Sequence, residues 1–303
     1  MLLFQQIEEL AHSHTDARHT IGEFLLKEKS SIKKYTMQEI AEKTYTSKSS
    51  LVRFAKALGF QGWKDFIEKF LNDTYYEESH YTDIDPNFPI EEGESTKDIV
   101  YKISSLMVES ILDTTDQLSL KEIDKAVNFM AEANQIALLG QSPNTYLGNL
   151  FRRKMMSIGK NVLLSSGWDQ GLLARTLHQG DCAILISYSG NNENRAPMNF
   201  IPMLQEKEVP IIAITGLGSN FLRRNADCIL SMSSRERLYT KIGTFSTEES
   251  IALILNTLYA CYFAKNYREN LRYKIDASKH LEKRYSRYAD IREETEEPGK
   301  PMR

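Results

Sequence analysis

Cysteine and histidine are scarce in this sequence, and neither residue type forms a cluster. The three cysteines, Cys182, Cys228 and Cys261, lie far apart within apolar runs. The only closely spaced histidines are His12 and His14, and nothing nearby completes a metal site. The pattern therefore predicts no disulfide framework, no metal and no cofactor, and it favours reduced, buried thiols in a cytoplasmic protein.

Long hydrophobic runs are also missing. The longest apolar stretch, residues 251–264, contains Asn256 and Thr257 and is shorter than the roughly 20 residues that a membrane-spanning helix needs. The first ten residues, MLLFQQIEEL, are too short and too charged for a secretory signal. We therefore expect a soluble intracellular protein with no membrane partner.

Charge is distributed unevenly, although the formal net charge is only -3. Residues 43–69 contain six basic residues and two acids, whereas residues 76–98 contain eight acids and one lysine. A basic segment of this kind is typical of a surface that meets a polyanion. Two solvated surfaces of opposite sign explain the charge alone equally well.

The 303 residues are enough for two domains, and the sequence pattern changes along the chain. The pattern predicts four segments: an all-α domain over 1–76, an acidic linker over 77–95, an α/β domain over 96–270, and a helical then loose tail over 271–303. In the third segment, strands alternate with helices, which predicts three layers around a mainly parallel sheet. The predicted strands are 136–139, 161–164, 182–187, 209–214 and 228–232. The predicted helices between and after them are 144–158, 169–177, 194–206, 219–225 and 247–264.

Two short helices joined by a tight turn are predicted near the N-terminus. Thr36 and Glu39 form a capping box that begins the first helix, and residues 44–46 form the turn. Ser47 caps the second helix, which Gly59 ends, giving the helix-turn-helix layout. Polar and basic residues of the second helix are predicted to contact DNA: Ser47, Lys48, Ser49, Ser50, Arg53 and Lys56. A generic helical hairpin with a basic solvent face is the alternative.

Hydroxyl-rich turns follow two of the predicted strands. Ser142 and Asn144 follow the strand 136–139, and the segment SYSGNN closes the strand 182–187 at what we expect to be the start of a helix. Hydroxyls and backbone N–H groups at such a place bind anions, and phosphate is the usual one. The candidate ligand residues are Ser142, Asn144, Ser187, Ser189, Gly190, Asn191 and Asn192. Serines that simply cap helices are the alternative.

The run TSKSSLVRFAKALGFQGWKDF, residues 46–66, resembles the DNA-binding domain of RpiR-type transcriptional regulators. Arg53-Phe54, Leu58-Gly59-Phe60 and Gly62-Trp63 carry the resemblance, which covers roughly residues 1–75. The turn departs from the family pattern, since Tyr45 and Thr46 stand where glycine and valine are usual. A non-glycine residue at positive φ there costs about 1 kcal/mol.

The second half resembles the SIS, or sugar isomerase, domain, which implies phosphosugar binding. Gly140 and Ser142 match its first signature turn. Ser187, Ser189 and Gly190 match its second, with Asn192 in place of the usual threonine. Leu138 replaces a frequent glycine, and KMMSIGKNV, residues 154–162, resembles the family's helix-to-strand passage. The resemblance spans roughly residues 105–265. It also implies that residues 246–249 lie near the pocket, which adds Glu249 to the candidate ligand residues; a capping box is the alternative there.

A DNA-binding head joined to a phosphosugar domain predicts a transcriptional regulator of carbohydrate metabolism genes, with a repressor favoured over an activator. Its expected partners are operator DNA, a sugar phosphate effector and further copies of itself, as a homodimer or homotetramer. The helices at 99–111 and 251–264 are the candidate interface elements.

A phosphosugar isomerase with an accessory helical domain is the alternative to a regulator. An isomerase needs a base, for which Glu193, Glu248, Glu249 and the less favourably placed His178 are candidates. No feature of the sequence marks any of these as a tuned base, so we predict no catalytic residue. A protein-binding adaptor that uses neither site is a third possibility.

Overall fold

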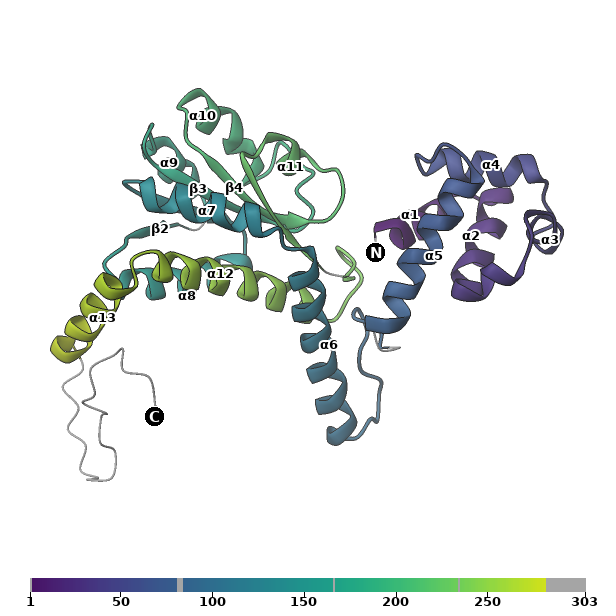
Figure 1. Ribbon diagram of the computed structural model, residues 1–303, viewed down its shortest axis with the longest axis horizontal. Helices are drawn as coiled ribbons and strands as arrows, with labels where there is room; N and C mark the ends of the chain where they lie inside the picture. The colour runs from purple at the N-terminus through teal and green to yellow at the C-terminus, as the bar shows by residue number, and fades with distance from the viewer. Residues whose placement is uncertain (1, 81–83, 166, 234, 282–303) are drawn as a thin grey trace.

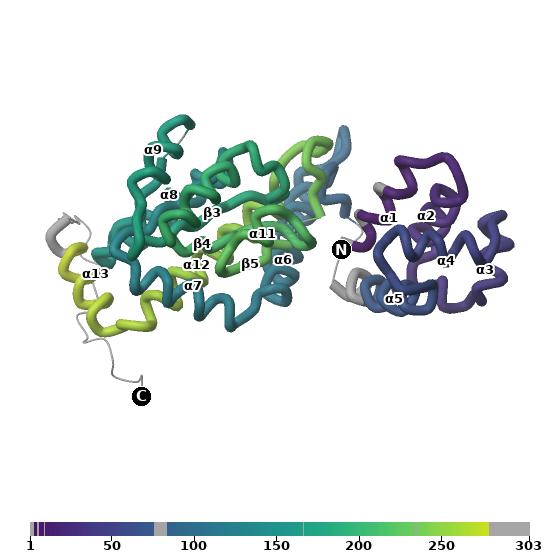
Figure 2. The backbone as a smooth tube through the Cα atoms, turned by 90° about the horizontal axis from the view of Figure 1, so that it is seen from above, coloured from purple at the N-terminus to yellow at the C-terminus, as the bar shows by residue number. Residues whose placement is uncertain are grey.

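The computed structural model describes residues 2–80, 84–165, 167–233 and 235–281. Residues 2–80 are helical and lie beside the α/β region at one end of the long axis (Figures 1 and 2). Buried apolar side chains, among them Ile7, Leu25, Phe54 and Phe66, form one core between these helices. The helices are α1 (Leu2–His12), α2 (Ala17–Glu28), the 3-10 helix η1 (Lys29–Lys34), α3 (Met37–Lys43), α4 (Lys48–Ala57) and α5 (Trp63–His80).

The second region is built around a parallel sheet. Its five strands are ordered β2-β1-β3-β4-β5 in the described part of the chain. The strands are β1 (Ile136–Gly140), β2 (Val162–Leu164), β3 (Cys182–Ser187), β4 (Ile211–Gly216) and β5 (Cys228–Met232). Because β2 lies on one side of β1 and β3 on the other, the strand order reverses at β1.

Helices cover both faces of this sheet, as the predicted three-layer architecture requires. Successive side chains of a strand point to opposite faces, so both faces of these apolar strands must be buried. Ile184 and Ile186 of β3 pack in one core, and Ala183 and Leu185 pack in the other. The first core is covered by α7 (Leu120–Glu132), α8 (Asn144–Met156) and α12 (Phe245–Lys265). The second is covered by α9 (Asp169–Thr176), the 3-10 helix η2 (Met198–Phe200), α10 (Ile201–Glu206) and α11 (Phe221–Asn225).

The predicted strands and helices are mostly confirmed, but the predicted helix over 194–206 is wrong at its start. Residues 194–197 are turns, and helical structure begins at Met198. Two features explain this. Asn192 Oδ1 accepts the N–H of Asn194 at 3.1 Å, a side-chain turn that competes with helix, and Pro197 disfavours helical backbone at Ala196.

The predicted linker over 77–95 differs from the structure at its start, and its middle part is not free. Helix α5 continues to His80, and residues 81–83 lie outside the described residues. Beyond them, Pro86 and Asn87 are buried. The side-chain oxygen of Asn87 accepts the N–H of Arg237 at 2.6 Å, and the backbone carbonyl of Asn87 accepts the N–H of Ile242 at 3.0 Å. This part of the linker is therefore held against the segment between β5 and α12.

Helix α6 (Thr96–Gln117) follows this docked segment, and its N-cap is Ser95, whose Oγ accepts the N–H of Asp98 at 3.2 Å. Beyond α12, the helix α13 (Tyr267–Leu281) confirms the predicted helical start of the tail, and residues 282–303 lie outside the described residues. Among the helices of the described residues, none is long and apolar enough to cross a membrane.

The two core cysteines lie near the amino ends of β3 and β5. Burial raises the pKa of Cys182 and of Cys228 to about 12, so both thiols are protonated at neutral pH. Cys261 is half-buried and also free. The predicted burial is therefore confirmed for Cys182 and Cys228.

Candidate functional site

Serine hydroxyls fix the start of α4. Ser47 precedes the helix, and its Oγ accepts the N–H of Ser50 at 3.2 Å. The same oxygen lies 2.9 Å from Ser49 Oγ and 3.0 Å from Ser50 Oγ. The predicted capping box of α3 is also present, with Thr36 and Glu39 exchanging both hydrogen bonds. Both helix starts are therefore as the sequence predicts.

One face of α4 is exposed and cationic. On the opposite face Leu51 and Phe54 are buried, whereas Leu58 is half-buried. Of the predicted DNA-contacting residues, Ser50 is half-buried and the others are exposed: Ser47, Lys48, Ser49, Arg53 and Lys56. The Arg53 guanidinium donates a hydrogen bond to Ser50 Oγ at 3.3 Å. Hydroxyls and cations of this kind reach phosphates and base edges, and their contact with DNA stays a prediction.

The turn before α4 holds a tyrosine in the left-handed region. Tyr45 has φ +52°, and its side chain is 96% exposed. The turn is closed by Thr46, whose N–H donates to Ala41 O at 2.8 Å, and by Thr44 Oγ1, which donates to Ile40 O at 2.8 Å. The positive φ expected at this position is therefore present without glycine.

A cavity of about 990 Å³ opens beside the carboxyl end of β1, where the strand order reverses. Ligands of open α/β sheets bind at this kind of position. Its walls are the start of α8, the loop before α9 and residues at 196–200. Ser142 lines it, as predicted, next to Gly140. Gly140 donates its N–H to Oε1 of the buried Gln170 at 3.0 Å, which fixes the floor of the cavity.

The chemistry of the cavity wall is that of a binding site. Serine, threonine, asparagine and glutamine side chains line it together with Tyr146, Trp168 and Phe200. Arg152 is the charged residue among the described residues that line it, and none of those residues is Asp, Glu, His, Cys or Lys. The cavity therefore offers hydrogen bonds, apolar faces and one positive charge.

The SYSGNN turn is tightly braced but lies outside this cavity wall. Ser187 Oγ accepts the N–H of Gly190 at 3.2 Å, and Gly190 has φ +58°. A Cβ there would lie 2.7 Å from Asn220 Oδ1 and 2.8 Å from Thr215 Oγ1, so glycine is required by packing as well as by φ. No helix begins at this turn among the described residues, which corrects the expected helix start, since the next helical residue is Met198.

Of the remaining predicted ligand residues, some form contacts within the protein and others are exposed to solvent. Asn144 begins α8 and donates through Nδ2 to Ile186 O at 3.5 Å, joining the first turn to the end of β3. Ser189 is half-buried, whereas Asn191 and Asn192 are exposed. The structure thus brings Ser142 into the cavity wall and leaves Ser187, Ser189, Gly190, Asn191 and Asn192 on the neighbouring turn.

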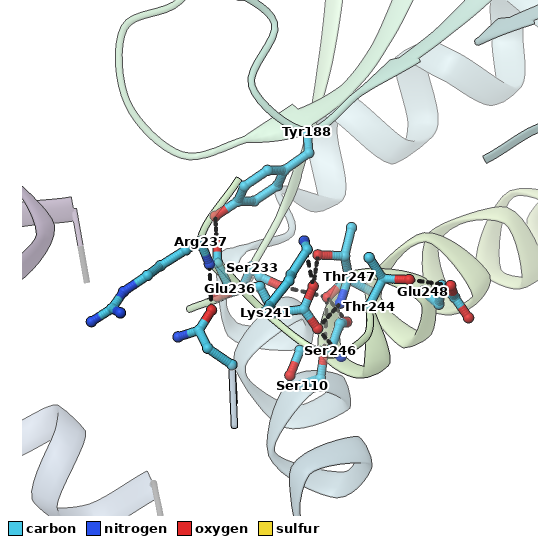
Figure 3. A network of polar contacts seen from close by, with 12 residues as sticks. Ser110, Tyr188, Ser233, Glu236, Arg237, Lys241, Thr244, Ser246, Thr247 and Glu248 are labelled. Atoms are coloured by element: carbon cyan, nitrogen blue, oxygen red, sulfur yellow. Dashed lines mark hydrogen bonds and ion pairs between the residues drawn. The ribbon is translucent and has the colours of Figure 1, made fainter. Parts of the chain in front are cut away.

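The start of α12 is capped by a carboxylate from outside the helix (Figure 3). The fully buried Glu236 side chain accepts the N–H of Ser246 at 2.6 Å and the Oγ1–H of Thr247 at 2.7 Å. Lys241 Nζ donates to the same carboxylate at 3.2 Å. The capping box considered over 246–249 is therefore wrong, because the helix begins at Phe245 and Glu236 satisfies its free N–H groups.

The candidate general bases are dispersed. Glu249 is half-buried on α12, Glu248 accepts a hydrogen bond from Thr244, and Glu193 is exposed. His178 precedes β3, at the amino end of the sheet, and its Nδ1 lies 3.3 Å from the Asp181 carboxylate. None of these residues is among the described residues that line the cavity.

Sequence reasoning missed Arg152, Gln170, Trp168 and Glu236. The first could have been found, because Thr145, Asn149 and Arg152 recur at helical spacing after the Gly140–Ser142 turn and share one face of α8. The role of Glu236 depends on contacts with residues ten or more positions away, so no local pattern marks it.

The chain joins a helix-turn-helix head, which presents a cationic helix, to a three-layer α/β domain with a cavity at its strand ends. This architecture is that of a ligand-binding regulator. Family comparison agrees: residues 1–74 match the helix-turn-helix domain of the rpiR family, and residues 129–256 match the SIS domain. The chain therefore combines an rpiR-family helix-turn-helix domain with a SIS domain.

Two relatives match most of the chain in sequence, and one solved protein shares its fold. An uncharacterized HTH-type transcriptional regulator of Thermotoga maritima is 27% identical over 89% of this chain and 96% of the relative. Another from Caldanaerobacter subterraneus is 24% identical over 92% of this chain and 96% of the relative. The Vibrio vulnificus NanR protein, solved with ManNAc-6P, is 17% identical with a TM-score of 0.56, over 92% of this chain and 97% of that protein. At this identity the likeness to NanR shows the fold.

Proposed function

We propose that this protein is a transcriptional repressor whose affinity for operator DNA changes when a sugar phosphate binds in the cavity beside Ser142. The observation that carries the proposal is the cavity itself. It lies at the switch point of the sheet, at the start of α8, where backbone N–H groups favour an anion. The solved NanR protein, which shares the fold, was crystallised with a sugar phosphate.

The cavity wall favours sensing over isomerisation. Moving a proton between sugar carbons requires a base within hydrogen-bond reach of the substrate. Among the described residues that line the cavity, no carboxylate, imidazole, thiol or amine is available. A ligand held there changes the balance between conformations of the protein rather than its own covalent structure.

A continuous set of contacts leads from the SYSGNN turn toward the head. The Tyr188 hydroxyl donates to Glu236 O at 3.0 Å, and Glu236 caps α12. Arg237, the next residue, donates its N–H to Asn87 in the segment that precedes α6. The start of α8, which lines the cavity, contacts the end of β3 through Asn144 and Ile186. A shift there on ligand binding would reach the docked part of the linker through Tyr188, Glu236 and Arg237, which is the physical element that such coupling needs.

Self-association is part of the proposal, because helix-turn-helix heads read paired half-sites. The exposed residues Val100, Tyr101, Val108 and Leu112 leave an apolar surface along α6. Helix α12 is less suited to an interface, since Ile251, Ile254, Leu255 and Leu258 are buried in the core. Analytical ultracentrifugation of the full chain should show a dimer or tetramer that Val108→Glu weakens; a monomer at all concentrations would contradict this.

A thermal-shift screen against sugar phosphates tests the ligand. Binding to the folded state stabilises it by RT ln(1 + [L]/Kd), about 2.7 kcal/mol at a ligand concentration of 100 Kd. We expect at least one sugar phosphate to raise the melting temperature and Ser142→Ala to reduce that shift. If no sugar phosphate shifts the melting temperature, the proposal fails. Steady product formation followed by NMR would establish the isomerase alternative instead.

DNA binding is tested with a fragment selected from a random library by the protein itself. Arg53→Ala should cost about 1–3 kcal/mol of binding and lower the salt dependence by about one unit of slope. Lys27→Ala removes an exposed cation of α2 and is the matched control. Equal behaviour of Arg53→Ala and wild type would favour an adaptor that does not use α4.

A further inference from the structure

The α8 side of the cavity carries a positive charge that the protein leaves unpaired. Arg152 is half-buried, and it makes no hydrogen bond or ion pair in the part of the chain that the structure describes. No Asp or Glu is among the described residues that line the same cavity. A guanidinium in a concave site gains most from a carboxylate or phosphate, which its planar fork can bind with two parallel hydrogen bonds.

Arg152 lies about two turns along α8 from the residues at the start of the helix. Asn144 is the first residue of α8 and Arg152 lies eight positions later. At a rise of 1.5 Å per residue, these positions are about 12 Å apart along the axis. Because Ser142 and Arg152 line the same cavity from positions two turns apart, one ligand can meet the helix start with one group and Arg152 with another.

Exposed aromatic side chains line the cavity between polar groups. Trp168 is 98% exposed and Tyr146 is 68% exposed, although both line the cavity. Large aromatic side chains bury much apolar area when a ligand covers them, and the polar edge of each can still form hydrogen bonds. The carbon chain of a sugar has the apolar C–H faces that fit such a wall.

From the unpaired Arg152, its distance from the helix start and the exposed indole of Trp168, we infer that the effector is a phosphorylated sugar acid. Its phosphate binds beside Ser142, its carboxylate pairs with Arg152, and Trp168 covers the carbon chain between them. This inference rests on the proposed function and narrows its ligand class. A neutral sugar phosphate would leave the guanidinium without a charged partner, whereas charge-assisted pairs are roughly twice as strong as neutral hydrogen bonds.

Binding of 6-phosphogluconate and glucose 6-phosphate to the full-length protein, measured by isothermal titration calorimetry, tests the inference. The two ligands have the same carbon number and phosphate position, and only the first carries a carboxylate. We expect wild type to bind 6-phosphogluconate at least about tenfold more tightly, which corresponds to about 1.4 kcal/mol. Arg152→Gln should bring the two affinities within about twofold of each other, mainly by weakening the binding of 6-phosphogluconate.

Arg153→Gln is the matched control, because Arg153 is the exposed neighbour on α8 and does not line the cavity. It should preserve the wild-type preference. Equal binding of the two ligands by wild type would overturn the inference, as would a loss of both affinities in Arg152→Gln, which would make this residue the phosphate ligand.

The thermal-shift panel separates this failure from a failure of the proposed function. If neutral sugar phosphates stabilise the protein and sugar acids do not, the sugar-acid inference is wrong and the regulator proposal stands. If neither class stabilises the protein, both are wrong.

Discussion

Two polar sites lie at the carboxyl edge of the same sheet, and they differ in how far the protein satisfies them. Around Glu236, a buried carboxylate is matched by Lys241 and by the first N–H groups of α12. In the cavity beside β1, Arg152 has no ion-pair partner among the described residues. Arg152 is half-buried, so water reaches its guanidinium in the absence of a ligand, and an anionic ligand can replace that water. The difference therefore separates a site that holds the fold together from the proposed binding site.

The largest expected effect is at the satisfied site. Glu236→Ala removes the partner of Lys241 and of the N–H groups of Ser246 and Thr247, so it should lower the free energy of unfolding by about 3 kcal/mol. Urea denaturation followed by circular dichroism measures this. Glu206→Ala, at an exposed position of α10, is the control and should change stability by less than about 0.5 kcal/mol. If the two variants lowered the free energy of unfolding equally, the Glu236 site would not be one that holds the fold together.

The turn between the two sites should give the next largest effect. Gly190→Ala places a Cβ within 2.8 Å of two polar atoms at φ +58°, so we expect a loss of about 2 kcal/mol. Gly62→Ala is the matched control, since a Cβ there has no neighbour within 4 Å. A loss below about 0.5 kcal/mol for Gly190→Ala would show that the turn can move aside.

Tyr45 tests whether φ or packing causes that loss. Its φ of +52° is close to that of Gly190, but its side chain is 96% exposed. Tyr45→Gly relieves about 1–2 kcal/mol of backbone strain and adds about 0.5–1 kcal/mol of chain entropy to the unfolded state. The head should therefore gain about 0.5 kcal/mol in urea denaturation. A clear loss would mean that the tyrosine stabilises the turn by contacts of its own.

The smallest effect is expected at the unpaired cation. Arg152→Gln should change the free energy of unfolding by less than about 0.5 kcal/mol in the absence of ligand, because it removes no hydrogen bond or ion pair of the described residues. Urea denaturation without and with a bound sugar phosphate measures this. A loss above about 1 kcal/mol without ligand would place Arg152 among the groups that hold the fold.

The regular elements could be predicted from local sequence because their causes are local. The strands are short runs of apolar residues, and the caps of α3, α4 and α6 each depend on a side chain within three residues of the N–H that it binds. The predicted start of a helix at the SYSGNN turn failed because Asn192 and Pro197 reshape the chain between β3 and Met198.

The candidate site could be predicted only in part. Ser142 was predicted as a ligand residue because a hydroxyl-rich turn at a strand end has a local signature, and it lines the cavity. Gln170 reaches Gly140 from thirty residues away, and Glu236 reaches α12 from ten, so their roles depend on the folded arrangement. For the same reason, the sequence did not show that the cavity wall includes Trp168 but not Ser187 or Ser189.

A titration of selected operator DNA with the wild-type protein, without and with a saturating sugar phosphate from the thermal-shift screen, tests the coupling between the two halves. Coupling free energies between sites are typically 1–3 kcal/mol, so the account predicts that the ligand weakens DNA binding about 5- to 150-fold. The Arg53→Ala variant, titrated in parallel, shows that the signal comes from α4. An operator Kd that is the same with and without a ligand known to occupy the cavity would contradict the account.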